Sequence, residues 1–461
     1  MIKMILSYLP SVVVPTLVSL FTTILYGNYM NPEDYGEYNI FITTISIIYT
    51  LLFSFVATSS LRYYNSYSTK NERYKIVSTY TITALILLGV LLVVMLPFKR
   101  IESLIVVGCI GSIAFYNIYS NLLRASDNKI GFNIVRISVP IGTLFIVLYL
   151  AWKSSLNSNT AIFSLYIPMG ITTVIISLTY FKKGLIRIGG SFSRPLLKES
   201  LIYGIPLAFS GLLNIGLSSS DRYLINYFLG SKDVGIYSFA YRIAELSMVN
   251  VTMVIMLALY PQLVKEYDKN GKIKAQELLN KYLVLHFIAI IPVVALIILY
   301  VDELMKVIFP AYKEGIPIIK LTVIGTFFFT ISNYTDKVFQ LTRNTREILI
   351  ILLISGIVNF LLNIAFIPFI GVQGAVLATV FSYILYIVLS IIKSNKYMKI
   401  QFPFKKLLFV LCLNGLVYLL VVLTIDQIFT NDLIRAIVGI TTYVTLYSII
   451  VYLYNYRKSK V

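Results

Sequence analysis

The chain has 461 residues, of which 58% are hydrophobic and only 13% are charged, and its mean hydropathy is +0.83. Soluble globular domains contain about 25% charged residues, so these values exclude that class. They predict an all-α integral membrane protein that crosses the bilayer many times. The formal net charge of +19 must then be explained by where the cations lie along the chain.

Fourteen apolar stretches are long enough to cross the hydrocarbon core of a bilayer, which needs about 20 residues of helix. Their centres lie near residues 18, 47, 87, 111, 144, 172, 212, 248, 289, 327, 358, 379, 416 and 443. The first begins directly after Lys3 without a small-residue cleavage site, so we expect a transmembrane helix there and not a removable signal peptide. The sequence thus predicts about fourteen transmembrane helices.

The lysines and arginines gather on alternate loops between these stretches. If the N-terminus lies in the cytoplasm, 27 cations fall on inner loops and termini and 6 fall on outer loops. This asymmetry follows the positive-inside rule, so we expect both termini in the cytoplasm. The excess charge then signals topology, with some attraction for membrane lipids that are anionic, and no nucleic acid is expected as a partner.

The sequence pattern of the first outer turn recurs about 200 residues later. A shift of 199 residues places Asp34, Gly36 and Tyr38 on Asp233, Gly235 and Tyr237. Each set lies at the first outer turn of six helices, so the chain is interpreted as a tandem repeat. Because six is even, both copies enter the membrane from the same side, which predicts two six-helix repeats around a central cleft.

The repeat predicts how the chain divides. We expect an N-terminal six-helix lobe over residues 1–190 and a C-terminal six-helix lobe over residues 191–400. Residues 401–461 should form transmembrane helices 13 and 14, which lie outside the repeat. The glycines and the proline between residues 182 and 199 mark the link between the halves.

The hairpin over residues 213–249 carries four charges in apolar surroundings. They are Asp221 and Arg222 before its turn, and Arg242 and Glu245 after it. Each lies about 12–18 Å into its helix at 1.5 Å per residue, which allows Asp221 to pair with Arg242, and Arg222 with Glu245. A charge in mid-bilayer costs at least about 2.5 kcal/mol, so these side chains must face protein or water.

Two interpretations of these charges stay open, and they are compatible. The first is a pair of buried salt bridges that joins two helices and adds little net stability. The second is a role in binding a substrate or an ion. In the first half, the same shift finds hydroxyls in place of the charges, at Thr22, Thr23, Thr43 and Ser46. These suggest a shared surface facing the cleft, although Thr and Ser are also ordinary packing residues in membrane helices.

Polar residues at helical spacing also mark three later spans. Asn333, Asp336, Lys337 and Gln340 form one polar face near the inner end of the tenth span. In the eleventh span, Ser355, Asn359 and Asn363 are each four residues apart. In the twelfth span, Gly374, Ala378 and Ser382 form a small-residue stripe suited to close helix packing.

These patterns give the candidate sites. Arg222, Arg242 and Lys337 are candidate substrate-binding residues, and Asp221, Glu245 and Asp336 are candidate ion-coupling or ion-pair residues. Cys109 and Cys412 lie far apart in predicted spans, so we expect no metal site and no cofactor. The sequence contains no GxxxxGK[ST] loop, so ATP hydrolysis by this chain is not expected.

Three stretches carry a resemblance to a known family. They are MNPEDYGEYNIF from residue 30, SSSDRYLINYFLGSKDVGIYSFAYRIAEL from residue 218 and LLNIAFIPFIGVQGAVLATVFSYI from residue 361. Together with about fourteen helices, they resemble the polysaccharide repeat-unit (lipid-linked oligosaccharide) flippases of the multidrug/oligosaccharidyl-lipid/polysaccharide exporter superfamily.

This resemblance implies a multi-pass protein of the bacterial cytoplasmic membrane. It would turn undecaprenyl-diphosphate-linked oligosaccharide from the inner to the outer leaflet by alternating access, for capsule, exopolysaccharide or O-antigen biosynthesis. The lipid-linked oligosaccharide is then the expected substrate, with a polysaccharide polymerase and export machinery as protein partners. Arginines in the cleft suit a diphosphate, because a guanidinium holds phosphate oxygens in a bidentate fork.

The chain departs from the lipid II flippases that it resembles in one respect. Their first helix carries arginine, whereas residues 7–29 here contain no cation, so no arginine contact is expected from that helix.

Two other classes of protein remain as alternatives. An ion-coupled multidrug or small-molecule exporter of the same superfamily would need carboxylates in the cleft without accompanying arginines, and the near balance of charges argues against it. An integral-membrane polysaccharide polymerase or ligase would need an extended outer loop or domain for catalysis. The longest outer loop, about residues 301–315, is too short to fold alone. We therefore expect a transporter and not an enzyme.

Overall fold

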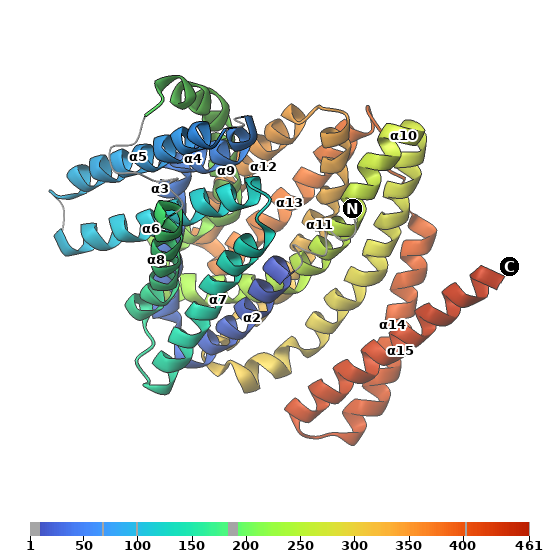
Figure 1. Cartoon of the computed structure of the whole chain (residues 1–461). Coiled ribbons are helices and arrows are strands. Elements are labelled where there is room, and N and C mark those ends of the chain that lie inside the picture. The colour runs from blue at the N-terminus through green and yellow to red at the C-terminus, as the bar shows by residue number, and fades with distance from the viewer. Residues whose placement is uncertain (1–9, 67–68, 98–99, 183–191, 402, 461) are drawn as a thin grey trace. The chain divides into compact units, whose positions relative to one another are not determined.

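A computed structural model describes residues 10–66, 69–97, 100–182, 192–401 and 403–460 (Figure 1). Within these ranges the regular elements are all helices. In a bilayer, a helix satisfies every backbone hydrogen bond within its own segment. The all-α membrane fold expected from the composition is confirmed.

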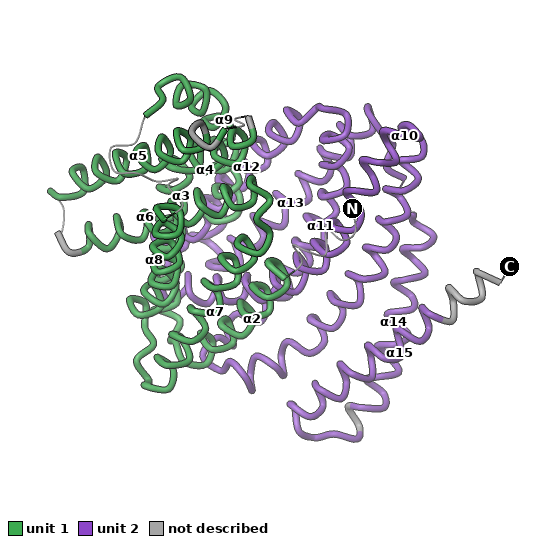
Figure 2. The backbone as a smooth tube through the Cα atoms, viewed as in Figure 1, with its two compact units in different colours: residues 1–219 green, residues 220–461 purple. Residues whose placement is uncertain are grey.

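The chain divides into two compact units, residues 1–219 and 220–461 (Figure 2). The helices of the first unit are α2 (Pro10–Tyr29), α3 (Pro32–Leu52), α4 (Ser54–Tyr63), η1 (Tyr64–Ser66), α5 (Lys70–Met95), α6 (Arg100–Ala125), α7 (Lys129–Trp152) and α8 (Ser158–Lys182). The boundary between the units falls inside α9 (Arg194–Phe228). The lobes expected over 1–190 and 191–400 stay a prediction.

The second unit contains the end of α9 and the remaining helices. These are α10 (Ser231–Ile308), η2 (Pro310–Gly315), α11 (Ile316–Leu341), α12 (Arg346–Ile370), α13 (Val372–Ser394), α14 (Phe404–Ile428) and α15 (Asp432–Lys460). α13 packs against α11 and α12, while α14 and α15 pack on each other and on α10.

The described helices provide fourteen membrane spans. Twelve are long and apolar enough to cross a bilayer, and α3 with α4 makes a thirteenth span that is bent by 53°. α10 alone has 78 residues, about 117 Å of helix, against a hydrocarbon core of about 30 Å. Its backbone leaves the helix at Gly271, where φ is +80°. α10 therefore contributes two spans, which confirms the expected number.

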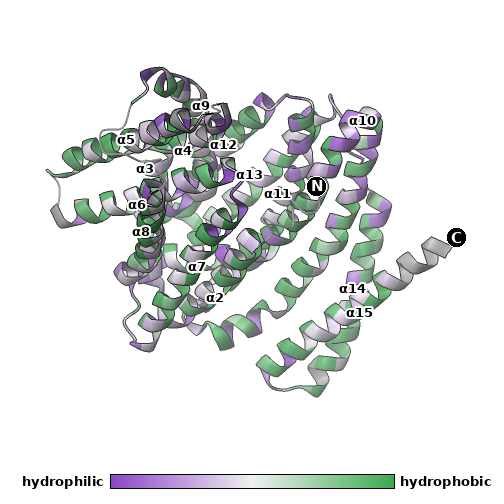
Figure 3. Cartoon of the chain, in the orientation of Figure 1, coloured by the Kyte–Doolittle hydropathy of each residue, from purple (hydrophilic) through white to green (hydrophobic). Residues whose placement is uncertain are grey.

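Hydrophobic residues occur along the length of these helices (Figure 3), and many large ones are exposed. Phe145 is 68% exposed and Phe369 is 86% exposed, and many aliphatic side chains are about half exposed. Exposed apolar surface on this scale is costly in water but suits contact with lipid tails.

Candidate functional site

The hairpin of α9 and α10 turns at Gly230, inside the range of residues 213–249 that the sequence predicts for it. Gly230 has φ +100°, a conformation that glycine adopts without steric cost. Its N–H donates to the carbonyls of Ile225 and Asn226, which closes the end of α9. The turn brings residues 220–228 of α9 beside the first turns of α10 within the second unit.

Asp221 is the most deeply buried charged residue of this hairpin, with 1% of its surface exposed. Its carboxylate accepts a short hydrogen bond from the hydroxyl of Tyr237 on α10. The backbone N–H of Arg222 donates to Oδ1 of the same carboxylate at 2.8 Å. A buried carboxylate needs such donors, because an unpaired charge in an apolar environment is costly.

Arg242 and Glu245 form an ion pair on α10 itself, with 3.1 Å between Nη1 and Oε2. The side chains remain 38% and 41% exposed. Residues three apart on a helix lie on the same face, which explains this pairing.

The structure therefore pairs these groups differently from the crossed arrangement expected from the sequence. Glu245 binds Arg242 on its own helix, and Asp221 takes its donor from Tyr237. Asp221 nevertheless lies beside α10, and its donor Tyr237 is five residues, about one and a half turns, from Arg242, the partner that its predicted depth allows.

One face of α13 carries a row of hydroxyls at helical spacing, at Thr379, Tyr383, Tyr386 and Ser390. Thr379 lies within hydrogen-bonding reach of Tyr237. The hydroxyls of Tyr383 and Tyr241 are 2.6 Å apart. We call these four residues the hydroxyl row.

The other end of the hydroxyl row reaches the second candidate carboxylate, Asp336 of α11. Tyr386 donates to its two oxygens at 3.2 and 3.3 Å, and Ser390 donates to Thr335 at 2.6 Å. The row thus contacts, on a single helix face, residues near both Asp221 and Asp336.

Lys337 lies next to Asp336 in the sequence but contacts different residues. Its Nζ donates to the side-chain oxygen of Gln340 at 2.9 Å and lies 4.4 Å from the ring centroid of Tyr260. A cation over an aromatic face is attracted by the ring quadrupole. The predicted polar face of this helix therefore splits between a carboxylate held by α13 and a cation held against α10.

Two asparagines of α12 extend the polar cluster around Asp221. Asn359 donates to Thr379 Oγ1 at 3.4 Å, and Asn363 donates to the side-chain oxygen of Asn359 at 3.1 Å. Both residues are fully buried. Within the described residues, Oδ1 of Asn363 is buried without a hydrogen-bond donor. This oxygen is therefore available to accept a hydrogen bond or to bind a cation.

The approach of α12 to α13 depends on a small residue at Gly374. A Cβ atom at this position would lie 2.7 Å from the backbone carbonyl of Phe366, closer than atoms can pack. The small-residue stripe expected in this span therefore serves close packing, which also brings Asn359 and Asn363 to the hydroxyl row.

The four hydroxyl residues that match the charges in the repeat are satisfied within their own helices. Thr22, Thr23, Thr43 and Ser46 each donate to the carbonyl four residues earlier, at 2.7 to 2.8 Å. This is ordinary bonding for hydroxyls in membrane helices. It supports the packing interpretation of these residues.

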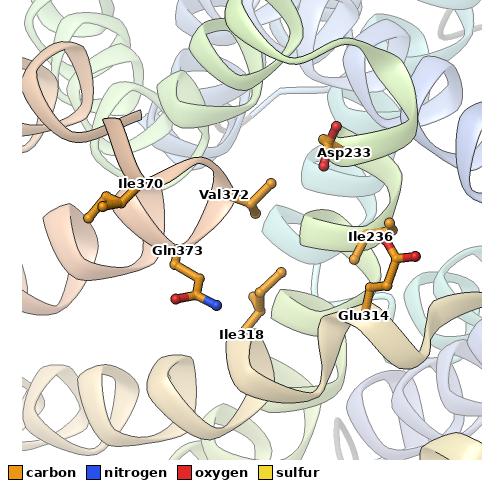
Figure 4. Close-up of a pocket in the computed structure, with 7 residues that line it drawn as sticks. All are labelled: Asp233, Ile236, Glu314, Ile318, Ile370, Val372 and Gln373. Atoms are coloured by element: carbon orange, nitrogen blue, oxygen red, sulfur yellow. The ribbon is translucent and has the colours of Figure 1, made fainter. Parts of the chain in front are cut away.

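A pocket of about 390 Å³ opens at the turn end of the second unit (Figure 4). Its polar groups are Asp233, Glu314 and Gln373, and its walls are aliphatic, formed by Ile236, Ile318, Ile370 and Val372. In the first unit the matching Asp34 accepts from the N–H of Ser158 at the start of α8, at 3.1 Å. At the start of α13 the cap residue is Gly371, without a side-chain cap, so the two turns differ although the sequence repeats.

The cluster around Asp221 is suited to a hard cation or a proton. It combines a carboxylate with hydroxyl and amide oxygens, the ligands that hard cations prefer. In the part of the chain that the structure describes, no group of three His, Cys, Asp or Glu side chains could hold a metal ion, so a transition-metal centre is not indicated there.

The hydroxyl row is the part of the site that the sequence interpretation missed. The pattern predicted for this span covers only its small residues, Gly374, Ala378 and Ser382. The signal was nevertheless present, because residues 379, 383, 386 and 390 recur every three or four positions.

Comparison with known proteins identifies the family. A model of the family described as polysaccharide biosynthesis protein matches residues 1–267, which is more than half of the chain. The MatE family model matches residues 206–365.

Two curated relatives share part of this sequence. An uncharacterised membrane protein of Methanocaldococcus jannaschii is 25% identical over 56% of this chain and 50% of its own length. The probable low-salt glycan biosynthesis flippase Agl15 of Haloferax volcanii is 22% identical over 60% of this chain and 56% of its own length. The matches thus span about half the length of these relatives.

Solved structures share the fold over nearly the whole chain. The lipid II flippase MurJ, in an inward closed conformation, has a TM-score of 0.73 at 16% identity and covers 96% of this chain and 98% of its own. An inward-facing multidrug resistance MATE transporter of the MOP superfamily has a TM-score of 0.67 at 16% identity, over 84% of this chain and 97% of its own. With the family model matched over 1–267, the chain belongs to the polysaccharide biosynthesis protein family, as its resemblance to the polysaccharide flippases predicted.

Proposed function

We propose that this protein is a flippase that moves undecaprenyl-diphosphate-linked oligosaccharide repeat units across the bacterial cytoplasmic membrane. The proposal rests chiefly on one observation, the partly exposed Arg242 and Glu245 pair inside a membrane helix, with Arg222 on the neighbouring helix. Family membership supports the substrate class, as does the name of the Haloferax relative.

Arginine in these positions suits a lipid diphosphate. A guanidinium has five donors in a fixed fork, so one carboxylate does not exhaust its hydrogen-bonding capacity. A diphosphate that leaves water needs such donors, because its charge is otherwise costly to desolvate. Arg222 and Arg242 would contact the diphosphate, and Lys337, held at Tyr260, would contact it nearer the cytoplasm.

The carboxylates would couple this movement to an ion or to a proton. Asp221 lies in the oxygen-rich cluster with Tyr237, Thr379, Asn359 and Asn363, and Asp336 lies at the other end of the hydroxyl row. In this scheme the chain is a transporter and not an enzyme, with both termini in the cytoplasm and with a polymerase and export machinery as partners. Its two six-helix lobes, over 1–190 and 191–400, would bound the cleft.

The test is export in cells whose own repeat-unit flippase gene is deleted. Arg222→Gln combined with Arg242→Gln should abolish restored surface polymer at equal membrane abundance, whereas Arg222→Lys should retain part of it. Lys313→Gln, an exposed residue of η2, serves as the matched control. Wild-type export by the double variant would refute the phosphate-binding role and leave the arginines as structural partners.

A multidrug exporter is the second candidate, because the MatE model matches the region that holds the charged hairpin. This alternative predicts that the wild-type protein makes the flippase-deleted cells less sensitive to drugs but does not restore their surface polymer. Restored polymer without any change in drug sensitivity would exclude it.

A further inference from the structure

A basic surface lies in the second unit where α10 bends and where α13 connects to α14. Its two segments, residues 272–281 and 395–406, contain seven lysines and one glutamate, a formal charge of +6. The seven lysine residues are all exposed. They are Lys272, Lys274, Lys281, Lys396, Lys399, Lys405 and Lys406, and we call them the basic surface.

The two segments are held together as one surface. The backbone N–H of Lys399 donates to the side-chain oxygen of Gln276, and that of Gln401 donates to the side-chain oxygen of Asn280, each at 3.2 Å. Beneath them a shared apolar cluster includes residues of both segments. These are Ala275, Leu279, Met398 and Ile400, all buried. The lysines therefore project from a fixed platform.

The basic surface lies at the end of membrane spans. A candidate span begins at Phe404, next to two of the lysines, and Phe404 is 73% exposed. Aromatic and basic residues at a span end are typical of the interface between lipid headgroups and water. The bond from Gln401 places Asn280 at this level, and Lys274 lies six residues earlier in α10, about 9 Å away along the helix. That separation is close to one Debye length at physiological salt, roughly 8 Å.

We propose that the basic surface binds the phosphate headgroups of anionic phospholipids. Lysine ammonium groups bind phosphate as point charges, and clusters of four to eight cations beside a membrane span are attracted to anionic lipid. An acidic soluble protein is the other possible occupant of a +6 surface. The exposed aromatic residue and the start of α14 beside the lysines favour lipid. The proposal is independent of the transported substrate.

The experiment uses the full-length protein, purified in mixed micelles that contain zwitterionic lipid. Phosphatidylglycerol is titrated in, and the bound lipid is counted by native mass spectrometry. The test variant replaces Lys281, Lys399, Lys405 and Lys406 with Gln. The matched control makes the same change at four exposed lysines elsewhere, Lys153, Lys232, Lys306 and Lys313, and therefore loses the same charge. A third variant replaces the four test lysines with Arg.

The test variant should bind phosphatidylglycerol at least tenfold more weakly, because each lysine near an anionic surface contributes about a factor of five. The control and the Arg variant should bind like the wild type, and wild-type binding should weaken as salt is raised. An unchanged thermal transition in purely zwitterionic lipid would show that the test variant is folded. If that variant is unfolded, the salt dependence of wild-type binding and the binding by the Arg variant still decide whether the lysines bind the lipid.

Three results would overturn the proposal. Wild-type lipid binding by the test variant would do so, as would equal losses in the test and control variants, since net charge alone would then explain binding. Loss of a co-purifying acidic protein with lipid binding intact would assign the surface to a protein partner instead.

Discussion

Removing the hydroxyl of Tyr237 tests how the buried carboxylate of Asp221 is stabilised. Tyr237→Phe deletes a single oxygen atom that donates to a charge with 1% exposure. Hydrogen bonds to charged groups contribute about 1.5–3 kcal/mol, so we expect the free energy of unfolding to fall by about that amount. Tyr443→Phe is the matched control, because its equally buried hydroxyl donates to the neutral amide of Asn414. A neutral hydrogen bond in a membrane protein contributes about 0.6 kcal/mol.

The assay is unfolding of the purified protein by SDS in mixed micelles, repeated in an Asp221→Asn background. In that background the amide is neutral, so the cost of Tyr237→Phe should fall to about 0.6 kcal/mol. The difference between the two backgrounds is the coupling free energy of the pair. The reasoning is refuted if Tyr237→Phe costs the same in both backgrounds and no more than Tyr443→Phe.

Three further predictions follow from the topology, the packing and the polar cluster. A cysteine introduced at Asn270 should be labelled only from the cytoplasm and one at Asn31 only from outside, and labelling of the first from outside would overturn the topology. Gly374→Ala should destabilise the protein by about 1–3 kcal/mol through overpacking, measured by thermal unfolding, while Gly356→Ala, with nothing within 4 Å of its Cβ, should not. Asp221→Asn should remove the dependence of transport on a cation or proton gradient in reconstituted vesicles, and a retained dependence would exclude this carboxylate from coupling.

The spans were predictable because each is a long apolar run between polar turns, and the bilayer thickness fixes its length. The turn at Gly230 and the burial of Asp221 followed from the same pattern. The pairing of the charges was not predictable in this way. Counting residues gives the depth of each group in the membrane, but Tyr237 and Arg242 lie only about one and a half turns apart on α10. The rotation of the helix decides which of them reaches Asp221, and in the structure it is Tyr237.

The inner loop between the eighth and ninth spans shows a second limit of sequence interpretation. Residues 265–281 are rich in charge, which alone would predict a loop, but the structure continues α10 through them and leaves the helix only at Gly271. Lys, Glu, Gln and Leu dominate this segment, and all of them are good helix formers. Hydropathy identifies the apolar residues that cross the bilayer. It cannot show whether the polar residues beyond them form a loop or continue the helix.

The positions that the sequence repeat matches are used differently in the two units. In the first unit, Asp34 is used structurally, since it accepts from the N–H of Ser158 at the start of α8, and Glu37 accepts from the Ser158 hydroxyl at 2.8 Å. In the second unit the sixth helix begins at Gly371 and Val372, which offer no hydroxyl, so Asp233 lines a pocket instead. The same change occurs deeper in the hairpin. Hydroxyls that bond within their own helices are replaced by charges: Arg242 and Glu245 pair on α10 itself, whereas Asp221 takes its donor from another helix, through Tyr237. At the positions that the sequence repeat matches, the first unit therefore has hydroxyls bonded within their own helices, whereas in the second unit Asp221 belongs to a polar cluster that depends on contacts between helices.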